Sequence, residues 1–175
     1  MSGFTCRPLA PKHASMHCPI SSKAVLQEIL LPQLVLRLVP TPDATVLVRL
    51  LSEHMAAATG LAAPTLEQAF TERLRRGGVA LPEGVAFPHA VIAGVRQTVL
   101  GLILVPGGIE LDPNQPPSEL VFAIAGDSAR PWEHVRLLAR LSLIASDPQA
   151  RKRLVASPDN ESLLKNLMQE DSAHG

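Results

Sequence analysis

Apolar residues recur along the chain in two patterns, one with the period of a helix and one in which nearly every position is apolar. The helical pattern occupies residues 41–60, 64–76 and 131–145, where apolar side chains return every three to four positions. The continuous pattern occupies residues 98–105 and 119–125, which have the length of strands. Strands that are apolar on both faces belong in a sheet covered by helices on both sides. The two patterns therefore predict an α/β fold.

Capping residues predict where the helices begin and end. Thr41 is expected as the N-cap of the first long helix, Pro42 as its first residue and Gly60 as its end. The second long helix is expected to begin at Pro64 and to stop at Gly77-Gly78. Two shorter helices near the C-terminus are expected after the cap-and-proline pairs Asp147-Pro148 and Ser157-Pro158.

Proline and glycine also predict the ends of the extended segments. Residues 25–31 are expected as a short helix or turn that Pro32 ends, and residues 34–39 as a first strand. The segment 79–83 is expected as a loop. Pro106-Gly107-Gly108 is expected to end the strand at 98–105 in a turn.

The two ends of the chain lack such patterns. Residues 1–24, rich in proline, serine and histidine, are expected to form a flexible N-terminal extension, and residues 170–175 a frayed tail. Residues 25–169 are then the one folded domain. The extension contains Cys6, His13, His17 and Cys18, whose spacing matches no common zinc motif, so a disordered extension is favoured over a metal site.

Charge and composition exclude several kinds of partner. The 16 basic and 16 acidic side chains cancel, and aromatic residues make up only 3%, so nucleic acid is not an expected partner. No apolar run reaches the roughly 18 residues that cross a bilayer, so direct membrane insertion is not expected. The start of the chain lacks the unbroken apolar stretch of a signal peptide. We therefore expect a cytoplasmic protein.

One candidate for chemistry is His89, in the stretch Gly84-Val85-Ala86-Phe87-Pro88-His89-Ala90. Pro88 fixes its own φ and keeps Phe87 out of the helical region, so His89 is expected to leave the end of a stiff, extended segment in a defined direction. An imidazole held in this way suits nucleophilic catalysis, and a histidine that only packs in the core is an equally good interpretation of this stretch alone.

The second candidate is His134, in the first turn of the helix at 131–145. It lies four residues before Leu138 and seven before Leu141, so its ring follows the buried stripe of that helix. Free N–H groups at a helix start favour anions. Alone, such a residue is more often a core histidine than a ligand. The sequence contains no Walker loop, no dinucleotide fingerprint and no nucleophile elbow, so these two histidines are the main chemical candidates.

Both stretches are similar to motifs of a known family. Residues 84–90 resemble the phosphorylation-site motif of the enzyme IIA proteins of the fructose/mannitol class of the bacterial phosphoenolpyruvate:sugar phosphotransferase system, which include the nitrogen-regulatory IIA proteins. The similarity continues through Leu120-Val121-Phe122 and through residues 134–141, which resemble the family's His-Leu-x-x-Leu-Ala-x-Leu helix. It covers roughly residues 25–169.

The resemblance implies a fold and a function. It implies a mixed β-sheet flanked by helices on both faces, with His89 as the phosphoryl acceptor and His134 as its support. Arg73 is the best match to the family's arginine on the preceding helix. The implied donor is a histidine phosphocarrier protein, and a IIB domain or a regulated transporter or kinase would be a further partner. No cofactor or metal is implied, because positioning and charge stabilisation suffice for phosphoryl transfer.

The chain also departs from the family pattern. Residues 79–83 lack the threonine and two glycines common before the motif, Leu74 replaces a common glutamate, and Val91 stands where an arginine or similar residue is frequent. Glu83 adds a negative charge that we expect near the site. These changes keep a second hypothesis open, namely a catalytically silent enzyme IIA-like binding module.

The role of a carrier stays open as well. The lack of a fused IIB-like domain in this sequence slightly favours a regulatory role over sugar uptake, and separate transport IIA proteins also exist. A zinc site that joins His89 and His134 is a third hypothesis, for which the sequence offers no third ligand at a recognisable spacing.

Overall fold

The structure, a computed structural model, describes residues 25–174. The predicted extension at residues 1–24, with its cysteines and two of the histidines, lies outside the described residues. In chain order the helices and strands are α1 (Val25–Ile29), β1 (Leu30–Arg37), α2 (Ala44–Thr59), α3 (Ala63–Arg75), β2 (Ala80–Leu81), β3 (Val85–Ala86), β4 (His89–Ile92), β5 (Val99–Ile109), β6 (Ser118–Asp127), α4 (Pro131–Ser146), α5 (Pro148–Val155) and α6 (Asn160–His174).

The strands form one mixed sheet of six strands. Its order is β1-β5-β6-β3-β2, and β4 pairs with β6 beyond the end of β3. β5 and β6 are antiparallel, whereas β3 and β4 both run parallel to β6, and β1 runs parallel to β5. The mixed sheet implied by the resemblance is therefore confirmed.

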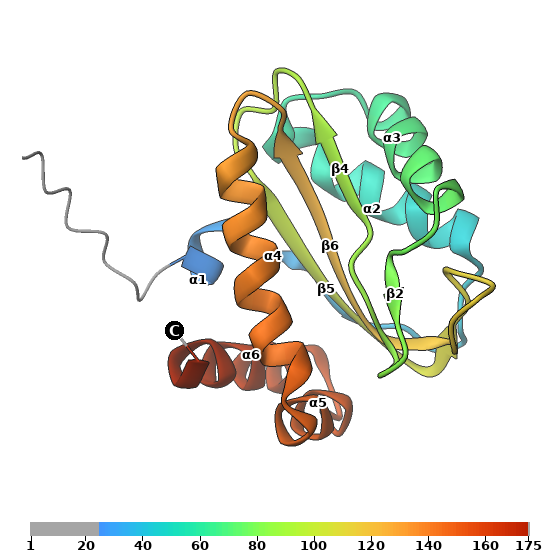
Figure 1. Cartoon of the computed structure of the whole chain (residues 1–175), viewed down its shortest axis with the longest axis vertical. Helices are drawn as coiled ribbons and strands as arrows, with labels where there is room; N and C mark the ends of the chain where they lie inside the picture. The colour runs from blue at the N-terminus through green and yellow to red at the C-terminus, as the bar shows by residue number, and fades with distance from the viewer. Residues whose placement is uncertain (1–24, 175) are drawn as a thin grey trace, which may run out of the picture.

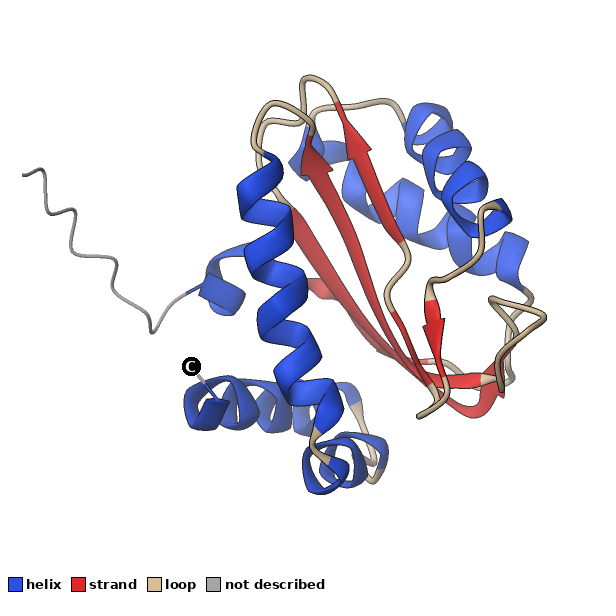
Figure 2. Cartoon of the chain, in the orientation of Figure 1, coloured by secondary structure: helices blue, strands red, loops and turns tan. Residues whose placement is uncertain are grey.

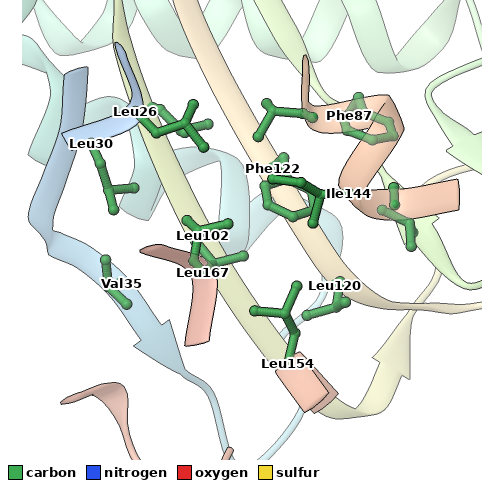
Figure 3. Packing of buried hydrophobic residues seen from close by; sticks show 14 of the residues in the cluster. Leu26, Leu30, Val35, Phe87, Leu102, Leu120, Phe122, Ile144, Leu154 and Leu167 are labelled. Carbon is green, nitrogen blue, oxygen red and sulfur yellow. The ribbon is translucent and has the colours of Figure 1, made fainter. Parts of the chain in front are cut away.

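Helices cover both faces of this sheet (Figure 1). On β5, Leu100, Leu102 and Leu104 face one apolar core, while Val99 and Ile103 face the other. The first core is filled by α1, α4, α5 and α6, as Figure 3 shows in part, and the second by α2 and α3. Burial of a leucine-sized side chain contributes about 2 kcal/mol. Because side chains on both faces of β5 and β6 are buried in this way, nearly every position of these strands is apolar.

The prediction of a turn at Pro106-Gly107-Gly108 is wrong, because β5, one of the long strands drawn red in Figure 2, continues through these residues to Ile109. The pairing of β5 with β6 shifts register between Leu104 and Ile109, which is the signature of a bulge. Gly108 adopts φ 69° there, a left-handed conformation that glycine tolerates. The proline and glycines bend a long strand and do not end it.

Pro32 likewise lies inside β1 and does not end a helix, because α1 ends earlier, at Ile29. A proline cannot donate to a sheet ladder, and it is tolerated here because β1 is an edge strand whose pairing is irregular between Leu30 and Val35.

Two predicted helix starts are also wrong in detail. α2 begins at Ala44, and its N-cap is Asp43, whose Oδ1 accepts a hydrogen bond from the Val46 N–H at 2.8 Å. α6 begins at Asn160, and the carboxylate of Asp159 accepts from the Ser162 N–H. In both cases an aspartate close to the predicted Thr or Ser supplies the cap. The predicted Asp147 cap of α5 and the Gly60 end of α2 are observed.

Residues 170–174 differ from the frayed tail that their polarity predicts. They form the last turns of α6, where Glu170 and Asp171 are buried. Glu170 pairs with Arg153 on α5, and Asp171 pairs with Arg140 on α4. These ion pairs hold the polar end of the helix on the domain. None of the helices in the described part of the chain is long and apolar enough to cross a membrane.

Candidate active site

His89 occupies the first position of β4, beside Ile124 of β6. The predicted extended segment is therefore split. β3 ends at Ala86, Phe87 and Pro88 bridge to β4, and the Pro88 carbonyl accepts from the Ile124 N–H at 3.0 Å. Since Pro88 has no N–H to give to a ladder, the chain shifts at this point. His89 consequently begins a strand, whereas the sequence predicted it at the end of one.

The stretch before His89 is anchored in the core. Phe87 is buried, and its ring stacks on Phe122 of β6 with centroids 5.5 Å apart (Figure 3). Its N–H donates to the Val79 carbonyl at 2.7 Å. Its carbonyl lies 2.9 Å from Nδ1 of His89. Because a carbonyl only accepts, this contact places the proton of a neutral His89 ring on Nδ1 and leaves the lone pair on Nε2.

Arg73 lies in the last turn of α3 and reaches the same ring. Its Nε donates to Nε2 of His89 at 2.9 Å, which agrees with a lone pair on that nitrogen. Its Nη1 donates to the Gly77 carbonyl at 2.7 Å, and Nη2 lies 3.4 Å from the Gly78 carbonyl. Both glycines have φ 68°, so two left-handed residues in succession turn these carbonyls toward the guanidinium.

His134 of α4 completes the cluster. It is buried, with 8% of its surface exposed, and its ring centroid lies 4.9 Å from that of His89 at an interplanar angle of 54°. Both ring nitrogens are buried and have no hydrogen-bond partner within the described residues. An unsatisfied buried polar group is costly. His134 therefore has hydrogen-bonding capacity that no described residue uses.

The environment keeps both rings uncharged at neutral pH. Burial lowers the pKa of His134 to about 4, and two positive charges add to this effect, that of His89 when it is protonated and that of Arg73. Burial also lowers the pKa of His89. The hydrogen bond to the Phe87 carbonyl raises this pKa in part, and the positive charge of Arg73 lowers it further. At pH 7 the cluster therefore offers two neutral imidazoles beside one fixed positive charge.

A hollow of ≈ 360 Å³ opens on His89. Its walls include Arg73 and two side chains that the sequence analysis did not single out as functional, Glu72 and Arg76, which form an exposed ion pair on α3. Their i,i+4 spacing is a signal that sequence reasoning could have used. Val91, two residues after His89 on the same strand face, also lines the hollow and is 43% exposed.

Glu83 lies away from this cluster, contrary to expectation. Residues 79–83 are not a plain loop, because Ala80–Leu81 pairs antiparallel with Val85–Ala86 in a short hairpin. Glu83 is exposed in the hairpin turn, where Gly84 has φ 74°, and β3 and Pro88 separate it from His89. The charge next to His89 is that of Arg73.

The zinc hypothesis requires a third ligand beside the two histidines. Within residues 25–174, one set of three ligand atoms lies close enough to hold a metal, and it comprises Asp147, Glu170 and His174, with neither His89 nor His134 in it. Arg153 already pairs with both carboxylates of that set.

Comparison with known proteins gives a consistent result. The family described as "Phosphoenolpyruvate-dependent sugar phosphotransferase system, EIIA 2" matches residues 30–170. The fructose-specific EIIABC component of Bacillus subtilis is 26% identical over 106 residues, which are 60% of this chain and 17% of that protein. The chain thus spans only about a sixth of this relative.

Solved structures share the fold. The nitrogen regulatory protein IIA-Ntr of Neisseria meningitidis superposes with a TM-score of 0.74 at 23% identity, covering 82% of this chain and 99% of that one. IIA mannitol of Escherichia coli superposes with a TM-score of 0.62 at 19% identity, covering 76% and 96%. A complex of the same organism's enzyme IIA mannitol with phosphorylated enzyme IIB matches with a TM-score of 0.60 at 20% identity, covering 77% and 95%.

Proposed function

Because the chain belongs to the EIIA 2 family of the phosphoenolpyruvate-dependent sugar phosphotransferase system, we propose that it is a phosphoryl carrier that accepts the group on Nε2 of His89. The observation that carries this proposal is the pair of hydrogen bonds on that ring. Phe87 accepts from Nδ1, and Arg73 donates to Nε2. These contacts hold the ring as the tautomer with its proton on Nδ1, and Nε2 faces Arg73, which lines the hollow.

The step moves one phosphoryl group between two imidazoles. The Nε2 lone pair of His89 attacks the phosphorus of a phosphohistidine on a protein donor, and the donor's N–P bond breaks as the new one forms. The product ring carries a proton on Nδ1 and a positive charge, which the Phe87 carbonyl stabilises. The lone pair left on the donor histidine accounts for the electrons, so no metal or cofactor is required.

Arg73 and His134 supply the electrostatics. The Arg73 guanidinium now caps the Nε2 lone pair, so it must shift when the phosphorus approaches, and its anchors at Gly77 and Gly78 keep it within reach of the phosphoryl oxygens. A neutral His134 has a ring N–H with no present partner, which can donate to the same oxygens. A preorganised donor of this kind contributes about 3 kcal/mol to the transition state.

Two roles for such a carrier share this first step. In a sugar-uptake role the group moves on to a IIB domain, and in a nitrogen-type regulatory role the phosphorylated protein changes its binding to a transporter or kinase through the added charge. We propose that the downstream acceptor distinguishes them. Transfer from phosphorylated His89 to IIB domains supports uptake, and a phosphorylated form that persists beside several IIB domains supports regulation.

The test of the shared step is an intact-mass measurement. The protein is incubated with phosphoenolpyruvate, enzyme I and a histidine phosphocarrier, beside the variants His89→Ala and His54→Ala. His54 is the matched control, because it is exposed on α2. We expect an acid-labile gain of one phosphoryl group in the wild type and His54→Ala and none in His89→Ala. No gain in the wild type with several carriers would contradict the proposal.

A silent binding module is the second candidate, and one observation favours it. The Arg73 Nε occupies the lone pair that must attack, and the hairpin at residues 79–86 lacks the family's flexible glycines. This alternative predicts that His89→Ala leaves partner binding unchanged and that no phosphoryl group is ever gained.

A further inference from the structure

The outer face of α4 carries apolar side chains that are largely exposed. Trp132 is 58% exposed, Val135 63% and Leu143 55%, and Ala139 between them is also exposed. At 100° per residue these four positions fall within an arc of about 80°, and they extend over about 16 Å of helix. We call them the α4 stripe.

A groove runs along one side of this stripe. It has a volume of ≈ 430 Å³ and lies between α4, the end of α1 and the segment that connects β4 to β5. Ile29 and Leu137 give it apolar walls, and Arg136 and Arg140 stand on its α4 side. On the helix, Arg136 lies about 40° from Trp132 and so separates the stripe from the groove.

The positive charges of the groove are unequally compensated. Arg130 pairs with Asp127 and Glu133, and Arg140 pairs with Asp171. Arg136 and Arg96 are both exposed, and neither has an ion pair with any residue from 25 to 174. The surface therefore combines an apolar seam of helical length with two uncompensated positive charges, of which Arg136 lies along the edge of the seam.

We propose that the α4 stripe and its groove bind an amphipathic helix of a protein partner, with an apolar seam that packs on Trp132, Val135 and Leu143 and acidic residues that pair with Arg136. An exposed apolar patch rimmed by charge marks an interaction surface. This surface does not depend on phosphoryl transfer at His89.

Charge argues against a second copy of the chain as the occupant. If two copies packed α4 against α4 in antiparallel orientation, residues on the same flank of both helices would meet. That flank carries the uncompensated charge of Arg136 in both copies, so like charges would face each other. A partner helix with glutamates on this flank would place opposite charges beside Arg136, and the two helices would attract each other.

Trp132 provides a direct probe, because it is the chain's one tryptophan. Two synthetic helical peptides share a leucine seam and differ only in their flanks, which are glutamate in one and lysine in the other. Titration of the full chain with the glutamate peptide should shift the Trp132 emission to the blue in a saturable manner. The lysine peptide should bind about tenfold more weakly, because like charges then face each other.

Charge reversal provides the control for specificity. Arg136→Glu should invert the preference, so that the lysine peptide binds more tightly. Arg75→Glu makes the same charge change at an exposed position on α3 and should leave the preference unchanged. Equal affinity for the two peptides, or no inversion in Arg136→Glu, would overturn the proposal.

Two further results would assign the surface to another occupant. If sedimentation shows a dimer of the free chain that Val135→Glu dissociates, the stripe is a self-interface. If the free monomer protects Trp132 from acrylamide, the chain's own residues 1–24 cover it. Either result overturns the proposal, whereas a monomer with a readily quenched Trp132 supports it.

Discussion

Three separate segments of the chain surround the imidazole ring of His89. The Phe87 carbonyl holds the proton on Nδ1, Arg73 donates to Nε2, and His134 lies beside the ring with both nitrogens unpaired. The sequence predicted all three charged or titratable members of this cluster. It could not predict the hydrogen bonds, because they depend on where Phe87 stacks and on how Gly77 and Gly78 turn after α3.

Replacement of Arg73 tests the electrostatic contribution at the residue scale. Arg73→Lys keeps the charge and loses the planar group that contacts Nε2 and two carbonyls at once. We expect phosphoryl transfer to His89 to slow about 10²-fold, measured as the rate of mass gain from a phosphorylated carrier. Arg75→Lys, on the exposed face of the same helix, is the control. An unchanged rate in Arg73→Lys would exclude Arg73 from the transfer step.

The lowered pKa of His134 predicts a pH dependence of stability. In the unfolded chain this histidine binds a proton below pH 6.5, and in the folded protein it does so only near its pKa of about 4. The unfolded state therefore binds more protons between these values, and the free energy of unfolding falls as the pH drops from 6.5 toward 4. His134 contributes up to about 3 kcal/mol to this fall.

The measurement is chemical denaturation of the wild type, His134→Gln and His54→Gln at several pH values. His134→Gln should flatten the fall between pH 6.5 and 4, and His54→Gln should not do so to this extent. A wild-type slope in His134→Gln would mean that His134 does not stay neutral on folding.

At the scale of elements, sequence patterns predicted the central strands and long helices well. They failed where a strand bends and then continues. The apolar runs of β5 and β6 and the period of α4 were sufficient, because each reflects burial against a sheet or core. Pro32 and Pro106-Gly107-Gly108 were interpreted as breaks because local propensity alone favours a turn there. The paired neighbour strand, which the sequence does not reveal, keeps both segments extended.

The bulge of β5 yields a prediction with a matched control. At Gly108, φ is 69° and an added Cβ would lie 2.8 Å from the Cβ of Pro117. At Gly94, φ is 83° and an added Cβ would meet nothing within 4 Å. Gly94→Ala carries only the conformational cost of about 1 kcal/mol, whereas Gly108→Ala adds a steric clash and should cost about 3 kcal/mol in total. Equal losses of unfolding free energy in urea would contradict the steric argument.

At the scale of the whole molecule, the two-sided core positions the site. α3 on one face brings Arg73 to His89, and α4 on the other brings His134 to the same ring (Figure 1). The sequence pattern predicted both helices and the fold class, and the resemblance of its motifs indicated the family. The meeting of the two helices at β4 depends on strand order, which periodicity does not encode.

The C-terminal helix shows how polar residues hold this arrangement together. Asp171 has a side-chain exposure of 6% and pairs with Arg140, whose side chain is 16% exposed, so α6 is tied to α4. Removal of one partner from a buried pair leaves an uncompensated charge, and Asp171→Ala should cost about 3 kcal/mol. Glu72→Ala breaks the exposed pair with Arg76 and should cost less than about 1 kcal/mol. Similar thermal stabilities of the two variants would contradict this assignment.

The central claim is that His89 carries the phosphoryl group on Nε2, and NMR of the phosphorylated protein with ¹⁵N-labelled histidine tests it most directly. Because the Phe87 carbonyl retains the proton on Nδ1, we predict phosphorus coupling to Nε2 of one histidine, with the signal lost in His89→Ala. Phosphorus coupled to Nδ1, or to a histidine other than His89, would contradict the account.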